Sequence, residues 1–386
     1  MHRLSIDNRL IMLSLFLWGM GEGQFTYLLP LYLSELGANP IQIGSILALA
    51  AAGAVITHIP TGYIADRLGR KPIIMVGFGL AAAVTLVMYL APDLRLFVPA
   101  LVIYQFTSFL SGPLSAYITG ARGTQSIQRA ITLVWIGYWS ALIVSPTIGG
   151  LIARSYGIRS LFGIALVLFV LSFFILLPLN PQVPEHRSIR LDRYKPLLTN
   201  WNFLHFLGLV FAVFVAMQLG MPLAPNFVSE VRGFDVWIIG LLGTCNSIGS
   251  VVLHLFLGGR MPQRMLVITQ IMMAAYIFIL LSSHSLPWLL VAFFFRSSWH
   301  LAHGMTVAQI GQVVSQSNIG LALGFVESVY GMALVLGPIA AGWLYELAPE
   351  LPFQVSLILI LLTIGLVWRF APQKSAESSI AAWDTL

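Results

Sequence analysis

Three ionisable side chains fall inside stretches that are otherwise apolar enough to cross a membrane: Glu22, Arg296 and Glu327. A charged group at the centre of a bilayer costs about 2.5–3.5 kcal/mol on insertion scales, so it usually faces a cavity or a partner. Removal from water favours the neutral form of a carboxyl group, which suits an acid that takes up and releases a proton. Glu22 lies between Gly21 and Gly23, whose lack of side chains leaves the carboxylate room. The sequence therefore predicts that Glu22 binds a proton or a cationic substrate, with an acid bonded to Arg296 or to a hydroxyl as the alternative.

The other two ionisable groups leave more than one interpretation open. Glu327 is expected to bind a proton or cation, or else to pack within the membrane. Arg296 either binds a substrate anion, relays protons or pairs with a glutamate. Further polar side chains are expected to line the same cavity or to bond neighbouring helices: Gln24, Gln105, Gln218 and Asn246. Aromatic side chains at Trp18, Phe25, Tyr27, Tyr104, Trp135, Trp139 and Trp299 would suit a greasy or aromatic substrate, or would serve packing.

Two histidines on one predicted helix face, His300 and His303, are spaced as metal ligands can be. Because no carboxylate or cysteine lies at a matching spacing, no metal site and no cofactor are predicted. The chain also lacks a His-Glu-x-x-His motif, a Gly-x-Ser-x-Gly motif and a Walker loop, so the sequence favours neither an enzyme nor a self-contained ATP-driven pump.

The composition indicates a membrane protein. The 386 residues are 58% hydrophobic and 9% charged, whereas about 25% of a soluble domain is charged. Twelve continuous apolar runs of about 20 residues begin near 9, 41, 72, 97, 130, 160, 203, 236, 265, 287, 319 and 352. These predict an all-α membrane protein with 12 transmembrane helices, a multi-pass protein of the cell membrane, whether plasma or inner.

The positive charges predict the orientation. With the N-terminus inside, fifteen of the 20 Lys and Arg residues fall on the cytoplasmic side, as the positive-inside rule requires, and both termini are cytoplasmic. The formal net charge of +6 is spread over loops between spans rather than gathered in one patch. The partner that it indicates is therefore the lipid bilayer and not nucleic acid.

An internal repeat divides the chain. Residues 130–146 align without gaps on residues 322–338, which places Tyr138 on Tyr330. The ends of the first and seventh runs also match, with Ser34 and Glu35 aligned on Ser229 and Glu230. The sequence thus predicts an N-terminal six-helix bundle over 1–179, a cytoplasmic linker over 180–200, a C-terminal six-helix bundle over 201–371 and a cytoplasmic tail over 372–386.

One charged loop resembles the signature of a known family. The stretch GYIADRLGRKP, between the second and third runs, resembles the major facilitator superfamily signature Gly-x-x-x-Asp-Arg-x-Gly-Arg-Lys/Arg, and it matches at Gly62, Asp66, Arg67, Gly69, Arg70 and Lys71. SPTIGG resembles the helix-five element associated with antiporters, at Ser145, Pro146, Gly149 and Gly150, and its helix-eleven counterparts are Gly337, Pro338 and Gly342. In helix one, MGEGQFTYLLPLYL looks like the drug/proton antiporter signature, with Tyr27 where the first proline belongs. The resemblance implies twelve helices in two pseudo-symmetric bundles.

The resemblance also implies a gate. In the superfamily the acid of the loop motif approaches the cytoplasmic start of helix eleven, here near Asn318 and Ile319, where the positive end of a helix attracts it. Asp66 would then hold the two halves shut, and Gly69 suits a turn that needs a positive φ. The alternative is a loop that only obeys the positive-inside rule, which explains Arg67, Arg70 and Lys71 but not Asp66.

The function that follows is secondary active transport of a small molecule by alternating access. Proton-coupled export of amphipathic or cationic compounds is the main prediction, with the proton as coupling ion and the protein acting as a monomer. A transporter of lipids, lysolipids or other metabolites is the alternative, because the cavity has few charges. A non-transporting membrane receptor of the same fold would lack a use for the gate motif.

Overall fold

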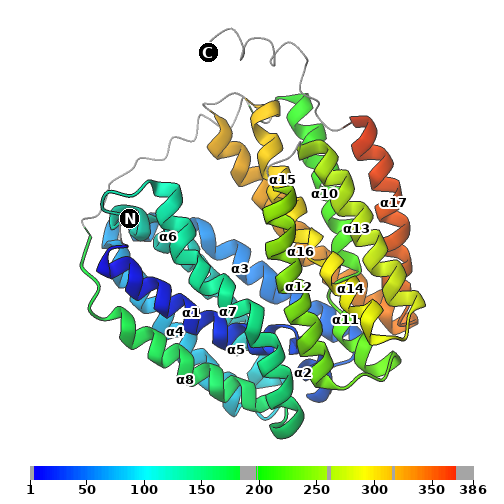
Figure 1. Cartoon of the computed structure of the whole chain (residues 1–386), viewed down its shortest axis with the longest axis horizontal. Helices are drawn as coiled ribbons and strands as arrows, with labels where there is room; N and C mark the ends of the chain where they lie inside the picture. Colours follow the sequence, from blue (N-terminus) through cyan, green and yellow to red (C-terminus); the bar gives the residue numbers. More distant parts are fainter. Residues whose placement is uncertain (1–3, 183–196, 198, 259–261, 315–317, 371–386) are drawn as a thin grey trace. The chain divides into compact units, whose positions relative to one another are not determined.

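The computed structural model of the chain describes residues 4–182, 197, 199–258, 262–314 and 318–370, with the backbone alone at 58–68, 262–263 and 320. Within these residues the fold is helical (Figure 1). The N-terminal elements are α1 (Ile6–Thr26), α2 (Leu29–Glu35), α3 (Pro40–Leu68), α4 (Arg70–Leu90), α5 (Leu94–Phe106), the 3-10 helix η1 (Thr107–Leu110), α6 (Ser111–Gly120), α7 (Ile127–Tyr156) and α8 (Arg159–Leu176). The later ones are α10 (Trp201–Leu219), α11 (Ala224–Asn226), the π-helical turn η3 (Phe227–Val231), α12 (Val236–Leu257), α13 (Pro262–Ser282), α14 (Leu286–Arg296), α15 (Ser298–Val313), α16 (Ile319–Leu347) and α17 (Leu351–Phe370).

Ten stretches of the described residues are long and apolar enough to cross a membrane, fewer than the twelve that the sequence predicts. Helix α1 is absent from the ten because Asp7, Arg9 and Glu22 lower its hydropathy. The run that begins near 287 is absent because it is divided into α14 and α15, each shorter than a span. The all-helical fold is confirmed, while the twelve-span count and the side of the termini stay predictions.

Two of the predicted runs break near a proline. The first run leaves the helix after Thr26 and resumes as α2, with Pro30 in its first turn. The seventh run leaves the helix after Leu219 and resumes as α11, with Pro225 in its first turn. Proline suits the start of a helix because it has no N–H to donate there. Pro30 and Pro225 are the prolines that the internal repeat aligns, so the two breaks are equivalent.

The fourth and tenth runs also break, the fourth with Pro113 in the first turn of α6 and the tenth without a proline at its break. The fourth passes through the 3-10 turn η1 between α5 and α6. The tenth breaks at Ser297, whose hydroxyl donates to the carbonyl oxygen of Phe294 at 2.6 Å, an alternative to the helical ladder. Interrupted helices at corresponding positions of the two repeats are typical of the binding region in secondary transporters.

The chain forms two compact units. Unit 1 comprises Met1–Ser188, Met221–Ile248 and Val335–Pro352, and unit 2 comprises Ile189–Gly220, Gly249–Leu334 and Phe353–Leu386. These units differ from the two sequence halves, because the ends of the seventh and eleventh runs and the start of the eighth belong to unit 1. The predicted bundles over 1–179 and 201–371, with their linker and tail, stay a prediction.

Helix α1 is the central element of unit 1 and packs most extensively on α7 and α8 (Figure 1). Small residues allow the close approach: a methyl group at Gly19 would lie 2.8 Å from the carbonyl oxygen of Tyr138. On the other side, the hydroxyls of Ser14 and Ser172 are 2.6 Å apart, and each also lies within hydrogen-bond distance of the other's carbonyl oxygen. Polar side chains thus join α1 to α8.

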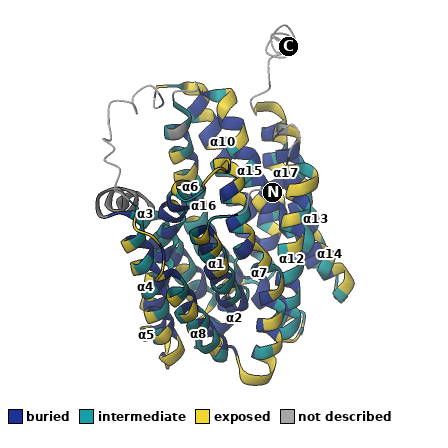
Figure 2. Ribbon diagram, turned by 60° about the vertical axis from the view of Figure 1, so that its left-hand side comes forward, coloured by how far each residue is buried: buried dark blue, intermediate teal, exposed yellow. Residues whose placement is uncertain are grey.

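In unit 2, α13 packs on α14 and α15. One buried cluster joins α12, α13 and α15, and its members are Leu253, Met265, Leu301 and Met305. Buried residues face neighbouring helices, and exposed ones follow the outer faces (Figure 2). Many exposed side chains are large and apolar, as expected of helices that face lipid.

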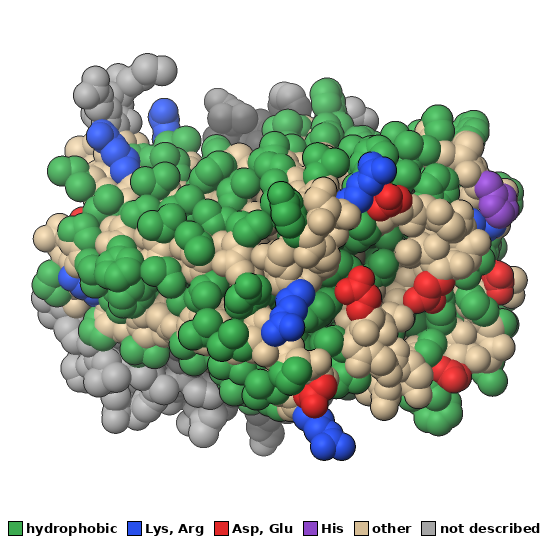
Figure 3. Space-filling view, turned by 90° about the horizontal axis from the view of Figure 1, so that it is seen from below, with side chains coloured by type: hydrophobic (Ala, Val, Ile, Leu, Met, Phe, Trp, Pro, Cys, Tyr) green, Lys and Arg blue, Asp and Glu red, His purple; other side chains and the backbone are tan. Residues whose placement is uncertain are grey.

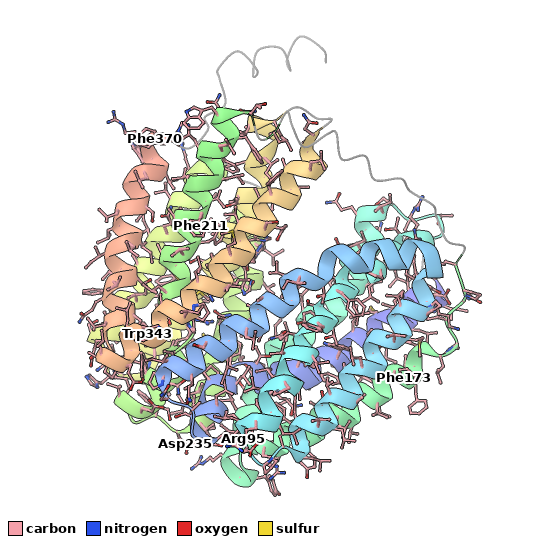
Figure 4. All side chains as sticks on the ribbon, turned by 180° about the vertical axis from the view of Figure 1, so that it is seen from behind. Arg95, Phe173, Phe211, Asp235, Trp343 and Phe370 are labelled. Atoms are coloured by element: carbon pink, nitrogen blue, oxygen red, sulfur yellow. The ribbon has the colours of Figure 1, made fainter. Side chains whose placement is uncertain are left out.

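Charges are scarce on the surface. The face seen from below shows separate acidic and basic side chains among hydrophobic ones rather than one basic patch (Figure 3). Trp343 of α16 and Phe370 of α17, labelled in Figure 4, are mostly exposed. On the described surface, this pattern suits contact with a bilayer.

Candidate functional site

Glu22 accepts two hydrogen bonds in the middle of unit 1. Trp18 lies one helical turn before it on α1, and its indole Nε1 donates to Oε2 at 3.0 Å. The hydroxyl of Tyr138, on α7, donates to the same oxygen at 2.9 Å. Both donors are neutral, so the carboxylate is stabilised without a cation beside it. The expected alternative of a bond to a hydroxyl is therefore present at Glu22.

The carboxyl group lines a cavity of about 200 Å³ whose walls are aromatic. Trp18 packs edge to face on Phe78 with ring centroids 4.6 Å apart, and Tyr104 of α5 stacks on it at 6.4 Å. Trp135 of α7 also lines the cavity. The hydroxyl of Tyr104 is buried beside the Glu22 carboxyl group and interacts with it electrostatically. The polar groups of this cavity wall thus gather around Glu22.

An aromatic cavity with a single carboxyl group can do two things chemically. The faces of Trp and Tyr rings attract an organic cation by about 0.5–2 kcal/mol each. The carboxyl group either neutralises such a cation or takes a proton in its place. The site suits a proton or a cation with an apolar body.

Unit 2 contains a second cluster, which joins α10, α15 and α16. His303 Nε2 lies 3.0 Å from Glu327 Oε1. Next to this pair, the indole of Trp299 donates to the hydroxyl of Tyr330 at 3.1 Å, and Phe214 packs on both rings. Sequence analysis named Glu327, His303 and Trp299 separately. It did not join them, because no local pattern relates residues of α15 to residues of α16.

The other predicted polar residues take different places. Gln105 lines the Glu22 cavity. Gln24 is buried and donates to the carbonyl of Met20, one turn back on its own helix. Asn246 is buried and bonds to the hydroxyl of Tyr27, within unit 1. Gln218 is half-buried near the end of α10.

Arg296 belongs to unit 2, at the end of α14. Its guanidinium lies over the ring of Phe293, 5.8 Å from the centroid. It therefore makes a cation–π contact of the kind that a cationic side chain finds within an apolar span. His300 follows it by one turn and lies within electrostatic range of Arg296, His254 and His303.

Comparison with known proteins decides the family. The model of the Major Facilitator Superfamily matches residues 11–260 and 207–385. The chain belongs to this superfamily. It is therefore a transporter of small molecules rather than an enzyme, and an integral, multi-pass membrane protein.

The relatives within the superfamily are distant. Multidrug resistance protein 2 of Bacillus subtilis (strain 168) is 23% identical over 389 residues, which cover 96% of each chain. The multi-drug resistance efflux pump PmrA of Streptococcus pneumoniae is 22% identical over 358 residues, 84% of this chain and 86% of that one. A solved structure of a mutant nucleoside transporter NupG has a TM-score of 0.82 at 16% identity, over 94% of this chain and 98% of that one. At that identity the likeness shows the shared fold alone.

The superfamily's loop motif is described in part. The side chains of Asp66 and Arg67, and the surroundings of Gly62, lie outside the described residues. Gly69 has φ of 86°, the positive value that the sequence predicts for it, and it precedes α4. Arg70 donates from Nη1 to the carbonyl of Ala116 at 3.0 Å and to Gln182 Oε1 at 2.9 Å.

The predicted packing motif lies at helix contacts within unit 1. Ser145 donates to the carbonyl of Gly19 at 3.2 Å, and a side chain at Gly149 would meet the backbone of Gln24. A methyl group at Gly150 would lie 2.9 Å from the Cα of Trp237. The helix-eleven counterparts behave alike: Gly342 approaches Pro40 and Gly44, the carbonyl of Pro338 faces Gly44, and Gly337 is buried.

Sequence analysis missed one polar cluster of unit 1, centred on Glu230 in η3. Its Oε1 accepts from Ser34 at 3.3 Å and from Asn226 at 3.0 Å, and its Oε2 accepts from Tyr345 at 3.2 Å. The segments that meet are the ends of the first, seventh and eleventh runs. Asp235, labelled in Figure 4, follows Glu230 by five positions and forms an exposed ion pair of 3.3 Å with Arg154, which stabilises little. The available signal was the repeat, which aligns Glu230 with Glu35.

Proposed function

We propose that this superfamily member is a proton-coupled exporter of amphipathic organic cations. The observation that carries the proposal is the Glu22 carboxyl group, held by Trp18 and Tyr138 in an aromatic cavity. The names of the distant relatives, multidrug resistance proteins and an efflux pump, support the same substrate class.

Competition for one carboxyl group would couple the two ligands. An organic cation binds the charged form, because its charge is then neutralised and its apolar body contacts the rings of Trp18, Tyr104 and Trp135. A proton at Glu22 removes that charge and releases the cation. Coupling between ligands is reciprocal, so the cation also expels the proton. Exchange of the two across the membrane follows when the site opens to one side at a time.

The proposal extends to the topology. Twelve spans arranged in two six-helix bundles, cytoplasmic termini, a monomeric state and the cell membrane all remain parts of it. So does the cytoplasmic gate at Asp66, with Arg67, Arg70 and Lys71. The interrupted helices at Pro30, Pro225, Ser297 and η1 support the repeated arrangement.

Proton movement in liposomes tests the coupling. The protein is reconstituted with a pH-sensitive dye trapped in an acidic lumen, and ethidium, a planar organic cation, is added outside. Exchange predicts a rise of the lumen pH that protein-free liposomes do not show. Glu22→Gln should abolish it, while Glu346→Gln, which changes an exposed acid of α16, should not. The proposal is wrong if ethidium moves no protons, or if Glu22→Gln exchanges as wild type does.

A lipid-like substrate is the second candidate. It is favoured by a larger cavity in unit 2, of about 670 Å³, between α10, α15 and α17. Its lining combines apolar Phe206, Leu209 and Leu366 with polar Asn202, His205 and Gln312. Lysolipid added in place of ethidium distinguishes the two candidates. Proton movement with lysolipid and none with ethidium would favour the second.

A further inference from the structure

The second acid of the apolar runs, Glu327, has an imidazole as its partner, which Glu22 does not have. Glu22 is held by an indole and a phenol, both neutral. Glu327 is held by the imidazole of His303 at 3.0 Å. An imidazole nitrogen binds a proton, which the indole of Trp18 does not, so the pair places two proton-accepting groups in contact.

The surroundings of the pair leave one side of it uncovered by protein. The side chains of His303 and Glu327 are 28% and 51% exposed. Behind them the rings of Tyr330 and Phe214 lie 4.4 Å and 6.3 Å from the imidazole. These aromatic contacts fix the imidazole toward the carboxylate. The pair is thus uncovered on one side and held in position on the other.

Several charged or titratable groups of the described residues face the pair or its neighbours. On its own chain segment His303 follows Arg296 and His300 at a helical spacing, and His300 lies within electrostatic range of His303, of Arg296 and of His254 on α12. Helix α16 contributes Glu327 and Tyr330, and α10 contributes the ring of Phe214.

The internal repeat relates this cluster to the Glu22 site. Tyr138 and Tyr330 are equivalent in the repeat, and each lies beside an acid and a tryptophan. In unit 1 the tyrosine and the tryptophan both donate to the acid. In unit 2 the tryptophan donates to the tyrosine instead, and a histidine contacts the acid. Each unit thus places an acid beside the equivalent tyrosine, Glu22 from α1 and Glu327 from α16, and gives it a different partner.

We propose that the His303–Glu327 pair is a second proton-binding site of the transport cycle. This inference rests on the proposed function and adds the number of protons exchanged for each cation. Exchange of about two protons for one monovalent cation moves a net charge, whereas exchange through Glu22 alone would be electroneutral. A net charge makes the exchange sensitive to membrane potential.

Membrane potential provides the test. The liposome experiment with ethidium is repeated at several potentials set by potassium and valinomycin. Two protons leaving the lumen for one cation entering predict that an interior-positive potential accelerates exchange. Passive leakage of ethidium responds with the opposite sign, so protein-free liposomes separate the two. Glu327→Gln and His303→Gln should exchange more slowly and without response to potential, while Glu346→Gln responds as wild type does.

If a variant no longer transports, the number of protons released when ethidium binds still tests the inference. In weakly buffered detergent solution, saturating ethidium should release about twice as many protons per bound cation from wild type as from Glu327→Gln. Equal release, or exchange by wild type that ignores the potential, overturns the inference. Failure of the proposed function looks different, because ethidium then moves no protons in any variant.

Discussion

The hydroxyl of Tyr138 donates a hydrogen bond of 2.9 Å to Oε2 of Glu22 and so ties α7 to α1 at the cavity. Tyr138→Phe removes this donor and keeps the ring, which packs edge to face on Trp135. A hydrogen bond to a charged group contributes about 1.5–3 kcal/mol, so the charged carboxylate that a cation requires becomes less favourable. We expect ethidium to bind about tenfold more weakly at fixed pH, measured by fluorescence titration.

The neighbouring Trp139 supplies the control for that measurement. Its side chain is 46% exposed and contacts the Tyr138 ring, and it is not among the residues that line the cavity. Trp139→Phe should leave ethidium affinity within about twofold of wild type. Equal affinities of Tyr138→Phe and wild type would show that the hydroxyl serves packing alone.

Gly240 allows α12 to approach α7 within unit 1. A methyl group there would meet the carbonyl of Pro146 and lie 2.9 Å from the Cα of Gly150. Backbone cannot move aside as a side chain does, so Gly240→Ala should cost about 1–3 kcal/mol. We expect a Tm lower by several degrees in detergent, followed by tryptophan fluorescence. Gly365→Ala is the matched control, since nothing lies within 4 Å of a methyl group there, and its Tm should not fall.

Glu230 joins three segments of unit 1 through Ser34, Asn226 and Tyr345. Glu230→Ala removes all three hydrogen bonds, so these segments should separate more often. The single cysteine of the chain, Cys245, lies half-buried on α12 in the same unit and reports such opening. We expect maleimide to label Cys245 several-fold faster in Glu230→Ala than in wild type.

Tyr345→Phe removes one of those three bonds and keeps the packing of the ring. Its labelling rate should fall between those of wild type and Glu230→Ala. A rate in Glu230→Ala that matches wild type would mean that the cluster does not limit access to Cys245.

The sequence predicted the fold class well and the continuity of individual helices poorly. Long apolar runs without alternation leave no other structure for a membrane, so the helices follow directly from composition. Pro30 and Pro225 signal their breaks in the sequence. Ser297 does not, because a serine bonds to its own helix backbone at a break and within an intact helix alike. The span count depended on such breaks and on the charges of α1.

The candidate site was predictable only in part, for a related reason. Glu22 and Glu327 stand out because an acid in an apolar run is rare. Their partners do not: Tyr138 is 116 positions from Glu22 and His303 is 24 from Glu327, and no local pattern connects them. The repeat gave the one hint, by aligning Tyr138 with Tyr330. The residue type of Glu230 gave no hint of its contacts, because acids at helix ends are common.

Asp66 carries the prediction for the cytoplasmic gate that the superfamily motif implies. Asp66→Asn keeps the size of the side chain and removes its charge, so attraction to a helix start should weaken. We expect most ethidium-driven proton exchange to be lost while the protein is still produced and purified in normal amounts. Normal exchange by Asp66→Asn would reduce the motif to a positive-inside loop.

At the start of α4, Lys71 anchors the end of α8. The structure describes this contact, whereas the side chain of Asp66 lies outside the described residues. The Lys71 Nζ donates to the carbonyl oxygens of Leu177 at 2.9 Å and Leu179 at 2.5 Å. These are carbonyls that the end of α8 leaves without helical partners, and a cation near a helix C-terminus is favourable. Lys71→Ala should therefore lower stability by about 1–2 kcal/mol, seen as a reduced Tm in detergent. Arg129→Ala, an exposed cation at the start of α7, should change Tm little, and equal Tm values for the two variants would show that water replaces the Lys71 bonds without cost.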